Sequence, residues 1–119
     1  MLINADCTLY AYDKVTGGFI RRFISSVYWR ESKAGNVLKS GLTTADSTTV
    51  YFYSDEVVPQ SVSKDMLVKG KCMFEFDNTS PQSISASMKA FRETYSFVTV
   101  MSIDNYMFGG NPHIEVSAK

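Results

Sequence analysis

The sequence predicts a mainly β fold, a small antiparallel barrel or sandwich of about six strands with one short helix at about residues 81–93. Three observations predict it. Short segments rich in aromatic and β-branched residues recur along the chain, turns with glycine separate them, and one segment alone has convincing helical spacing. Closure of such a sheet removes its exposed edges. The chain has 119 residues, so we expect a single β-rich domain, 1–119, with one core.

The first two strands are predicted to form a hairpin. Residues 5–12 alternate with a period of two, which is typical of a half-buried strand. Gly17 and Gly18 then supply a turn. Residues 19–32 are rich in aromatic and β-branched side chains, but neither face is cleanly apolar. A bulge at Ser25 and Ser26, or burial of both faces at different points, would reconcile this pattern.

The middle of the chain is less regular. Residues 32–49 are long and polar, which predicts either a long loop or a short edge strand around 37–42. Residues 48–53 are predicted to form a short strand. Residues 66–76 are predicted to form the next one, with Gly70 marking a bulge or a close backbone approach.

The helix begins with a strong start signal, because Ser80 is a good N-cap residue and Pro81 suits the first helical position. Ile84, Met88 and Phe91 then form one apolar stripe, which we expect to pack on the sheet.

The last two strands are predicted to form the clearest hairpin of the chain. Residues 95–106 alternate, residues 108–112 form a turn with Gly109 and Gly110, and residues 113–118 close the fold as a final strand.

Composition limits the function classes. Twelve Lys and Arg residues balance twelve Asp and Glu residues, which argues against a general nucleic-acid binder. No apolar run approaches the ~20 residues that span a bilayer, so we expect no membrane association. The first residues show no secretory signal. We therefore expect a reducing compartment, with Cys7 and Cys72 as unpaired thiols in the core.

The charges are unevenly distributed. Residues 13–40 hold six cations and two anions, a net charge of +4, and residues 41–68 hold one cation and four anions, a net charge of −3. This pattern fits two solvated faces, and it also fits complementary sides that associate head to tail into a ring.

No catalytic, cofactor-binding or metal-binding residues are predicted, and we expect the protein not to be an enzyme. A Ser–His–Asp or Cys–His site would have to use His113, the single histidine, which we expect at a turn edge or an interface instead. Asp104 lies across the predicted hairpin and is a candidate structural contact for it. Glu75 and Asp77 share one face of the predicted strand, where a solvent-facing strand end explains them as well as acid–base chemistry does.

Ligand motifs are also missing from the sequence. The paired glycines match no phosphate-binding loop, and no metal-ligand cluster or calcium loop is present, so we expect no cofactor. Residues 51–53 (Tyr-Phe-Tyr) on a small barrel would suit base stacking, but acidic neighbours at Asp46, Asp55 and Glu56 would repel phosphates. Core and interface packing is the better interpretation.

Segments over nearly the whole chain resemble one family. They are residues 4–10 (NADCTLY), 27–29 (VYW), 45–50 (ADSTTV), 65–70 (DMLVKG) and 98–105 (VTVMSIDN), with Gly110, Pro112, His113 and 114–116 (IEV). The chain resembles short uncharacterised phage and prophage proteins encoded with the head–tail connection genes of tailed phages of Gram-positive hosts. It departs from them at Lys64, where related sequences tend to have glycine.

The resemblance implies a virion structural protein of the neck, assembled in the host cytoplasm. Such a head-closure, adaptor or tail-completion protein would form a homo-oligomeric ring between the portal and the tail, with packaged DNA passing through its lumen without sequence-specific contact. We therefore expect portal, adaptor and tail proteins as partners, and residues 32–49 and 57–63 as assembly loops. The alternative is a small β-barrel module that binds single-stranded nucleic acid or carbohydrate.

Overall fold

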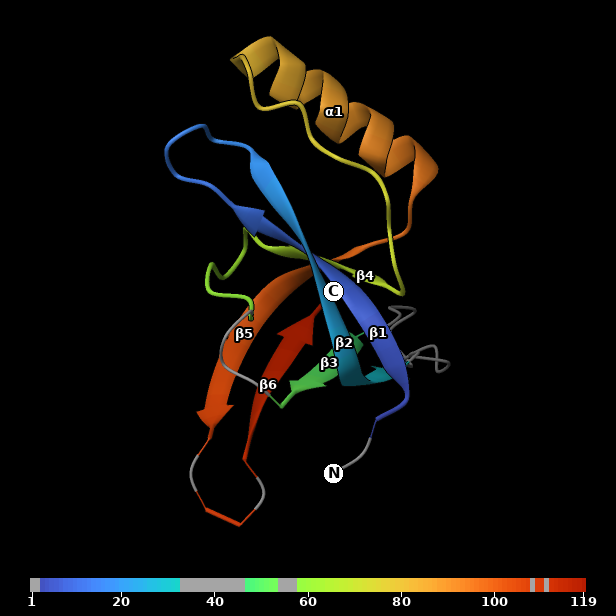
Figure 1. The fold of residues 1–119 in the computed structure, drawn as a ribbon, viewed down its shortest axis with the longest axis vertical. Helices are drawn as coiled ribbons and strands as arrows, with labels where there is room; N and C mark the ends of the chain where they lie inside the picture. The colour runs from blue at the N-terminus through green and yellow to red at the C-terminus, as the bar shows by residue number, and fades with distance from the viewer. Residues whose placement is uncertain (1–2, 33–46, 54–57, 108, 111) are drawn as a thin grey trace, which may run out of the picture.

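The computed structural model, which describes residues 3–32, 47–53, 58–107, 109–110 and 112–119, confirms a mainly β fold with one helix (Figure 1). All paired strands are antiparallel, and they close into a barrel in the order β1-β2-β3-β6-β5-β4. The elements are β1 (Ala5–Tyr12), β2 (Phe19–Ser32), β3 (Ser47–Phe52), β4 (Met66–Lys69), α1 (Pro81–Thr94), β5 (Val98–Tyr106) and β6 (His113–Ala118). Of the two predicted architectures, the barrel is therefore the one adopted.

The interior of the barrel is filled with apolar side chains. This barrel core consists of Cys7, Leu9, Val27, Trp29, Val50, Phe52, Leu67, Val100, Ile114 and Val116. Every strand contributes to it, so burial of these side chains from water holds the closed sheet together.

A second cluster lies outside the barrel, beneath the helix. This helix-side core consists of Tyr10, Phe19, Met66, Val68, Cys72, Phe76 and Phe91. Leu9 and Tyr10 are adjacent residues of β1 whose side chains point to opposite faces. Leu9 belongs to the barrel core and Tyr10 to the helix-side core, and both are fully buried. The prediction that residues 5–12 form a half-buried strand is therefore wrong, because the helix layer covers the face that the sequence assigns to solvent.

A bulge resolves the mixed faces of β2, as predicted. Cys7 pairs with Ile24 and Ala5 pairs with Val27, so β2 holds one more residue than β1 across this interval. Ser26 takes a φ of 63°, and its N–H donates to the Asp6 carboxylate at 3.1 Å. The extra residue places Ile24 and Val27 on the same side, toward the barrel core.

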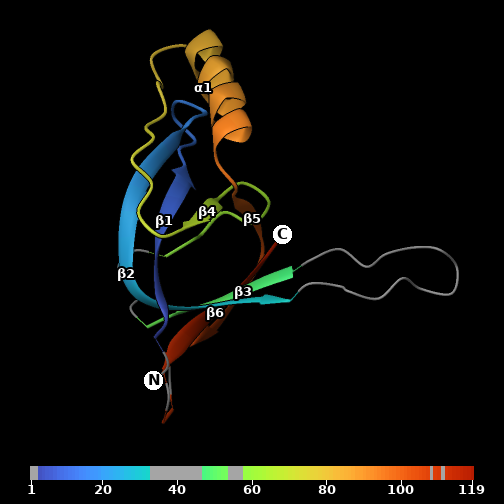
Figure 2. The same ribbon diagram turned by 90° about the vertical axis from the view of Figure 1, so that its right-hand side faces the viewer.

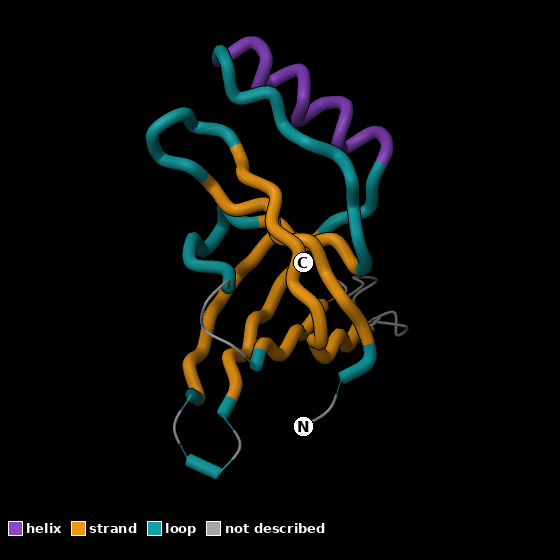
Figure 3. Tube along the Cα trace, in the orientation of Figure 1, coloured by secondary structure: helices purple, strands orange, loops and turns teal. Residues whose placement is uncertain are grey.

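The strand predicted for residues 66–76 ends early, at Lys69. Gly70 follows with a φ of 85°, a left-handed conformation that glycine adopts without strain. The Thr8 hydroxyl then draws the chain off the sheet, since it donates to the Gly70 carbonyl and accepts from the Cys72 N–H, both at 2.8 Å. Residues 70–80 lead away from the barrel to the start of α1 (Figure 3).

The helix begins and ends close to its predicted limits. The Ser80 hydroxyl accepts from the Ser83 N–H at 3.1 Å, and Pro81 occupies the first turn. Phe91 is the one fully buried side chain of α1, and its ring contacts Tyr10, Phe74, Phe76, Tyr95 and Phe97. Ile84 and Met88, which the apolar stripe also assigned to the core, are only partly buried.

The last hairpin is confirmed, with one irregularity that the alternation does not predict. Val100 pairs with Ala118 and Ser102 pairs with Ser117, so β5 has an extra residue at Met101. The bulge lets Val100 and Ile103 both pack on the barrel core, although they stand an odd number of positions apart.

Both ends of the segment 32–49, which the sequence predicts to be a loop or a short edge strand, belong to strands. β2 extends to Ser32 and β3 begins at Ser47, and these two residues are register partners. The interval 33–46, with the alternative edge strand around 37–42, lies outside the described residues. Among the described residues, no helix is long and apolar enough to cross a membrane.

Candidate functional site

His113 lies at the start of β6, at the edge of the last hairpin, as predicted. Its register partner on β5 is Tyr106, whereas Asp104 stands opposite Glu115. Its ring lies 5.0 Å from the Tyr51 ring and 5.1 Å from the Tyr106 ring, measured between centroids. The structure therefore places His113 among aromatic rings.

Glu75 and Asp77 are not on a strand, contrary to the prediction. Glu75 is 70% exposed and forms an ion pair with Arg21 at 2.7 Å. Asp77 is fully exposed and accepts from the Thr79 hydroxyl and N–H, which lower its pKa. Both carboxylates therefore face solvent, and neither is part of a strand face.

Both cysteines are buried free thiols, as predicted. Cys7 belongs to the barrel core and Cys72 to the helix-side core. Burial, with a smaller contribution from the charge of Asp6, raises the pKa of the Cys7 thiol to about 12. The reactive thiolate is therefore scarce at neutral pH.

The paired glycines of the first hairpin have different structural roles. Gly17 has a φ of 78° in the turn. A Cβ on Gly18 would collide with the side-chain amide of Asn78. That amide accepts from the Phe19 N–H and donates to the Phe19 carbonyl, so it takes the place of a neighbouring strand beside β2.

Four rings form a continuous row on the outer face of the barrel. This aromatic row consists of Tyr28 on β2, Tyr51 on β3, His113 on β6 and Tyr106 on β5. The Tyr28 and Tyr51 centroids lie 5.4 Å apart. Tyr106 is 44% exposed, and the other three rings are partly buried. Phe52, the middle residue of the predicted stacking triplet, instead points into the barrel core.

An acidic pair lies beside the aromatic row. Asp104 on β5 and Glu115 on β6 are register partners, and Glu115 is also the register partner of Tyr51. Like charges opposite one another destabilise a strand pair. Within the part of the chain that the structure describes, neither carboxylate forms an ion pair.

A second surface feature is a groove of about 690 Å³ between α1 and the first hairpin. Tyr12, Phe19, Ile84 and Met88 supply its apolar walls. Among the described residues that line it, the charged ones are three cations and one anion, Lys64, Lys89, Arg92 and Glu93, and we call it the cationic groove. The Lys64 ammonium lies over the Tyr12 ring, 5.3 Å from its centroid.

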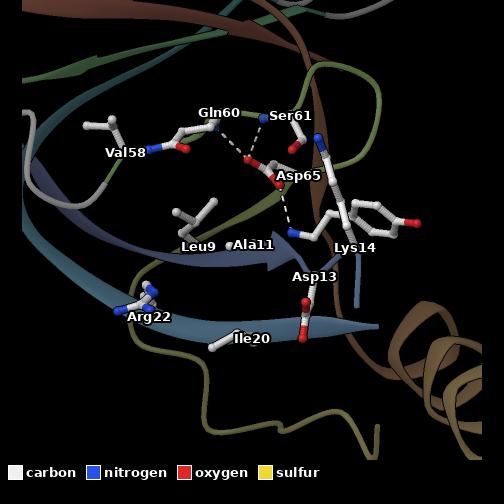
Figure 4. Close-up of a pocket in the computed structure, with 11 residues that line it drawn as sticks. Leu9, Ala11, Asp13, Lys14, Ile20, Arg22, Val58, Gln60, Ser61 and Asp65 are labelled. Atoms are coloured by element: carbon white, nitrogen blue, oxygen red, sulfur yellow. Dashed lines mark hydrogen bonds between the residues drawn. The ribbon is translucent and has the colours of Figure 1, made fainter. Parts of the chain in front are cut away.

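A smaller cavity of about 370 Å³ lies between the inner face of the first hairpin and residues 58–61 (Figure 4). Its polar centre is Asp65, which is 2% exposed. The Asp65 carboxylate accepts from the backbone N–H groups of Tyr12 at 2.8 Å, Gln60 at 2.7 Å and Ser61 at 3.0 Å. Asp65 therefore ties the described part of the predicted assembly loop, residues 58–63, to the barrel.

The role of Asp65 also changes the predicted charge distribution. One of the four anions that give residues 41–68 their negative charge is buried and satisfied internally. The other three, Asp46, Asp55 and Glu56, lie outside the described residues. Among the described residues, the opposite charges of the surface therefore lie in the acidic pair and in the cationic groove, neither of which the sequence predicted.

Comparison with known proteins identifies one family. The model of a family of unknown function matches residues 2–119, an interval that includes every strand and the helix. No curated protein and no solved structure matches the chain. The resemblance to phage connection proteins therefore stays a prediction.

Proposed function

We propose that this chain, which belongs to the DUF6751 family, is a structural subunit of a phage head–tail connector that forms a ring between portal and tail. It would act as a head-closure, adaptor or tail-completion protein in the virion neck. The distributed resemblance described above supports this assignment. Two surfaces suited to protein contact, the aromatic row and the cationic groove, support it independently.

The aromatic row carries the proposal. Because the barrel core fills the interior, a partner protein would bind to the outer surface of the barrel. The row spans four adjacent strands there and presents the amphipathic side chains that are enriched at protein interfaces. A subunit held between neighbours in a ring needs such a surface.

The alternative function, binding of single-stranded nucleic acid or carbohydrate, draws on the same row, because rings on a small barrel can stack bases or sugars. Two observations favour protein contact. The rings of the row lie about 5 Å apart, so they cover part of one another's faces. The acidic pair beside them repels phosphate groups.

The test uses phage particles from a lysogen that carries the gene. Mass spectrometry of purified virions should detect the chain, and particles made without it should show filled heads that are not joined to tails in electron micrographs. Normal, infectious particles without the chain would refute the proposal.

A binding assay tests the alternative. Fluorescence anisotropy with labelled single-stranded DNA should show no binding at physiological salt. Affinity that falls steeply with salt and that disappears in Tyr51→Ala would favour the nucleic-acid function instead.

A further inference from the structure

We infer that the acidic, aromatic end of the β5–β6 hairpin in one copy docks into the cationic groove of the next copy. This inference rests on the proposed function, since it assumes that copies of the chain associate in a ring. It adds which two surfaces meet and which side chains make the contact.

The side chains that line the cationic groove suit a partner that is both acidic and aromatic. Its volume of about 690 Å³ lies within the range of ~300–1,000 Å³ that is usual for binding pockets. Within the described residues, Lys64, Lys89 and Arg92 form no ion pair, and Glu93 is the one anion that lines the groove. An apolar or aromatic side chain would pack against the apolar walls, and carboxylates would pair with the three cations.

The end of the last hairpin offers both. Tyr106, the most exposed ring of the aromatic row, lies at the last residue of β5. Asp104 stands two residues before it on the same face, opposite Glu115. Cations placed against this acidic pair would remove the repulsion between its two carboxylates. Arg30 lies on the same outer face but forms no ion pair within the described residues.

The positions of the two surfaces favour a second copy as the occupant. Helix α1, which forms one wall of the groove, lies at one end of the long axis. The paired ends of β5 and β6 lie toward the other end, as Figures 1 and 2 show from two directions. A molecule therefore cannot fill its own groove. Contact between unlike surfaces of identical copies is heterologous, and it builds a closed ring when the rotation between subunits closes.

The experiment measures association of the purified full-length chain by sedimentation velocity over a range of protein concentrations. A groove variant, Lys89→Glu with Arg92→Glu, and a hairpin variant, Asp104→Lys with Glu115→Lys, should each raise the dissociation constant at least about tenfold. Tyr106→Ala should weaken association by a similar factor. Lys71→Glu, an exposed lysine outside the groove, is the matched control and should leave the constant unchanged.

Charge exchange provides the decisive comparison. A chain that carries all four reversals, or an equimolar mixture of the groove and hairpin variants, should recover association to within about threefold of the original, because each acidic surface again meets a basic one. Circular dichroism melting curves of the variants establish that each one folds.

Three results would overturn the inference. A chain that stays monomeric at every concentration excludes the contact. A chain that forms rings with the same dissociation constant in both reversed variants associates through other surfaces. In that second case the connector function stands, because it is tested separately by the composition of virions. In the third case the groove variant keeps its self-association and loses only its binding to another virion protein. That result would assign the groove to that protein and overturn the inference as well.

Discussion

Asn78 explains why residue 18 is glycine. Its amide makes two hydrogen bonds to the backbone of Phe19, at 3.3 and 3.1 Å, in the space that a Cβ on Gly18 would occupy. We expect Gly18→Ala to displace the amide and to lower the free energy of unfolding by about 1–3 kcal/mol. Urea denaturation measures the effect, and Gly110→Ala, where the added Cβ meets nothing, is the matched control. Equal midpoints for the two variants would contradict this account.

The Asp65 carboxylate holds residues 60 and 61 against the end of β1. Asp65→Asn keeps the size of the side chain but turns one acceptor into a donor, which then faces backbone N–H groups. We expect a loss of about 2–3 kcal/mol in the free energy of unfolding, measured by urea denaturation at neutral pH. Glu93→Gln, at an exposed helix position, should leave the denaturation midpoint where it is. A stable Asp65→Asn variant would show that the carboxylate does not anchor this segment.

The Cys7 thiol makes stability depend on pH in the alkaline range. Its pKa is raised from 9.0 to about 12 by burial and by Asp6, so the folded state keeps a proton that the unfolded state releases. The contribution is complete below pH 9 and is lost as the pH rises toward 12. Between pH 8 and 10.5 we expect a loss of about 2 kcal/mol from this group, at ~1.4 kcal/mol per pH unit above 9.

Urea midpoints at the two pH values, compared between the original chain and Cys7→Ala, isolate this contribution. The alanine variant should show the smaller alkaline loss. Burial and the neighbouring Cys72 also raise the pKa of Tyr10, so part of the loss should persist in the variant. Identical alkaline losses in both chains would mean that the thiol ionises without cost.

At the scale of elements, the seam between β4 and β5 is the shortest in the barrel. It has two register pairs, Met66 with Thr99 and Leu67 with Val98. β2 and β3 share a longer register, and β1 and β2 a longer one still. We expect amide protons along the β4–β5 seam to exchange at least about tenfold faster than those between β2 and β3. Hydrogen exchange followed by NMR would reveal it, and uniform protection of all strands would show that the barrel opens only as a whole.

Local signals predicted most element boundaries because they act within one turn of helix or one strand. Ser80 and Pro81 start the helix, and the break in parity at Ser25 and Ser26 indicated the bulge that the structure contains. The early end of β4 and the burial of both faces of β1 were not predictable in this way. Both depend on residues distant in sequence, such as the Thr8 hydroxyl that binds Gly70 and Cys72.

At the scale of the whole molecule, the segment that joins β2 and β3 is one of the two predicted assembly loops. Ser32 and Ser47 are register partners, so the ends of this segment are already adjacent. Deletion of residues 35–41 leaves seven residues to connect them, which exceeds the two to five or so that close a hairpin. We expect the shortened chain to fold with an unchanged melting temperature but to leave heads and tails unjoined in complementation assays. Infectious particles carrying the deletion would exclude an assembly role for residues 35–41.

The sequence by itself determined the fold class, the helix after Ser80, the two hairpins and the unpaired cysteines, because each follows from periodicity, caps, turns or side-chain chemistry within a short stretch of chain. Only the tertiary structure decided that the sheet forms a barrel rather than a sandwich, that β1 lies between two cores, and that four rings from β2, β3, β6 and β5 meet in one row. It also brought Lys64 beside Lys89 and Arg92 across the cationic groove. The physical reason is that these contacts depend on which strands become neighbours, and neighbour choice is settled by packing of the whole core, which no short segment encodes.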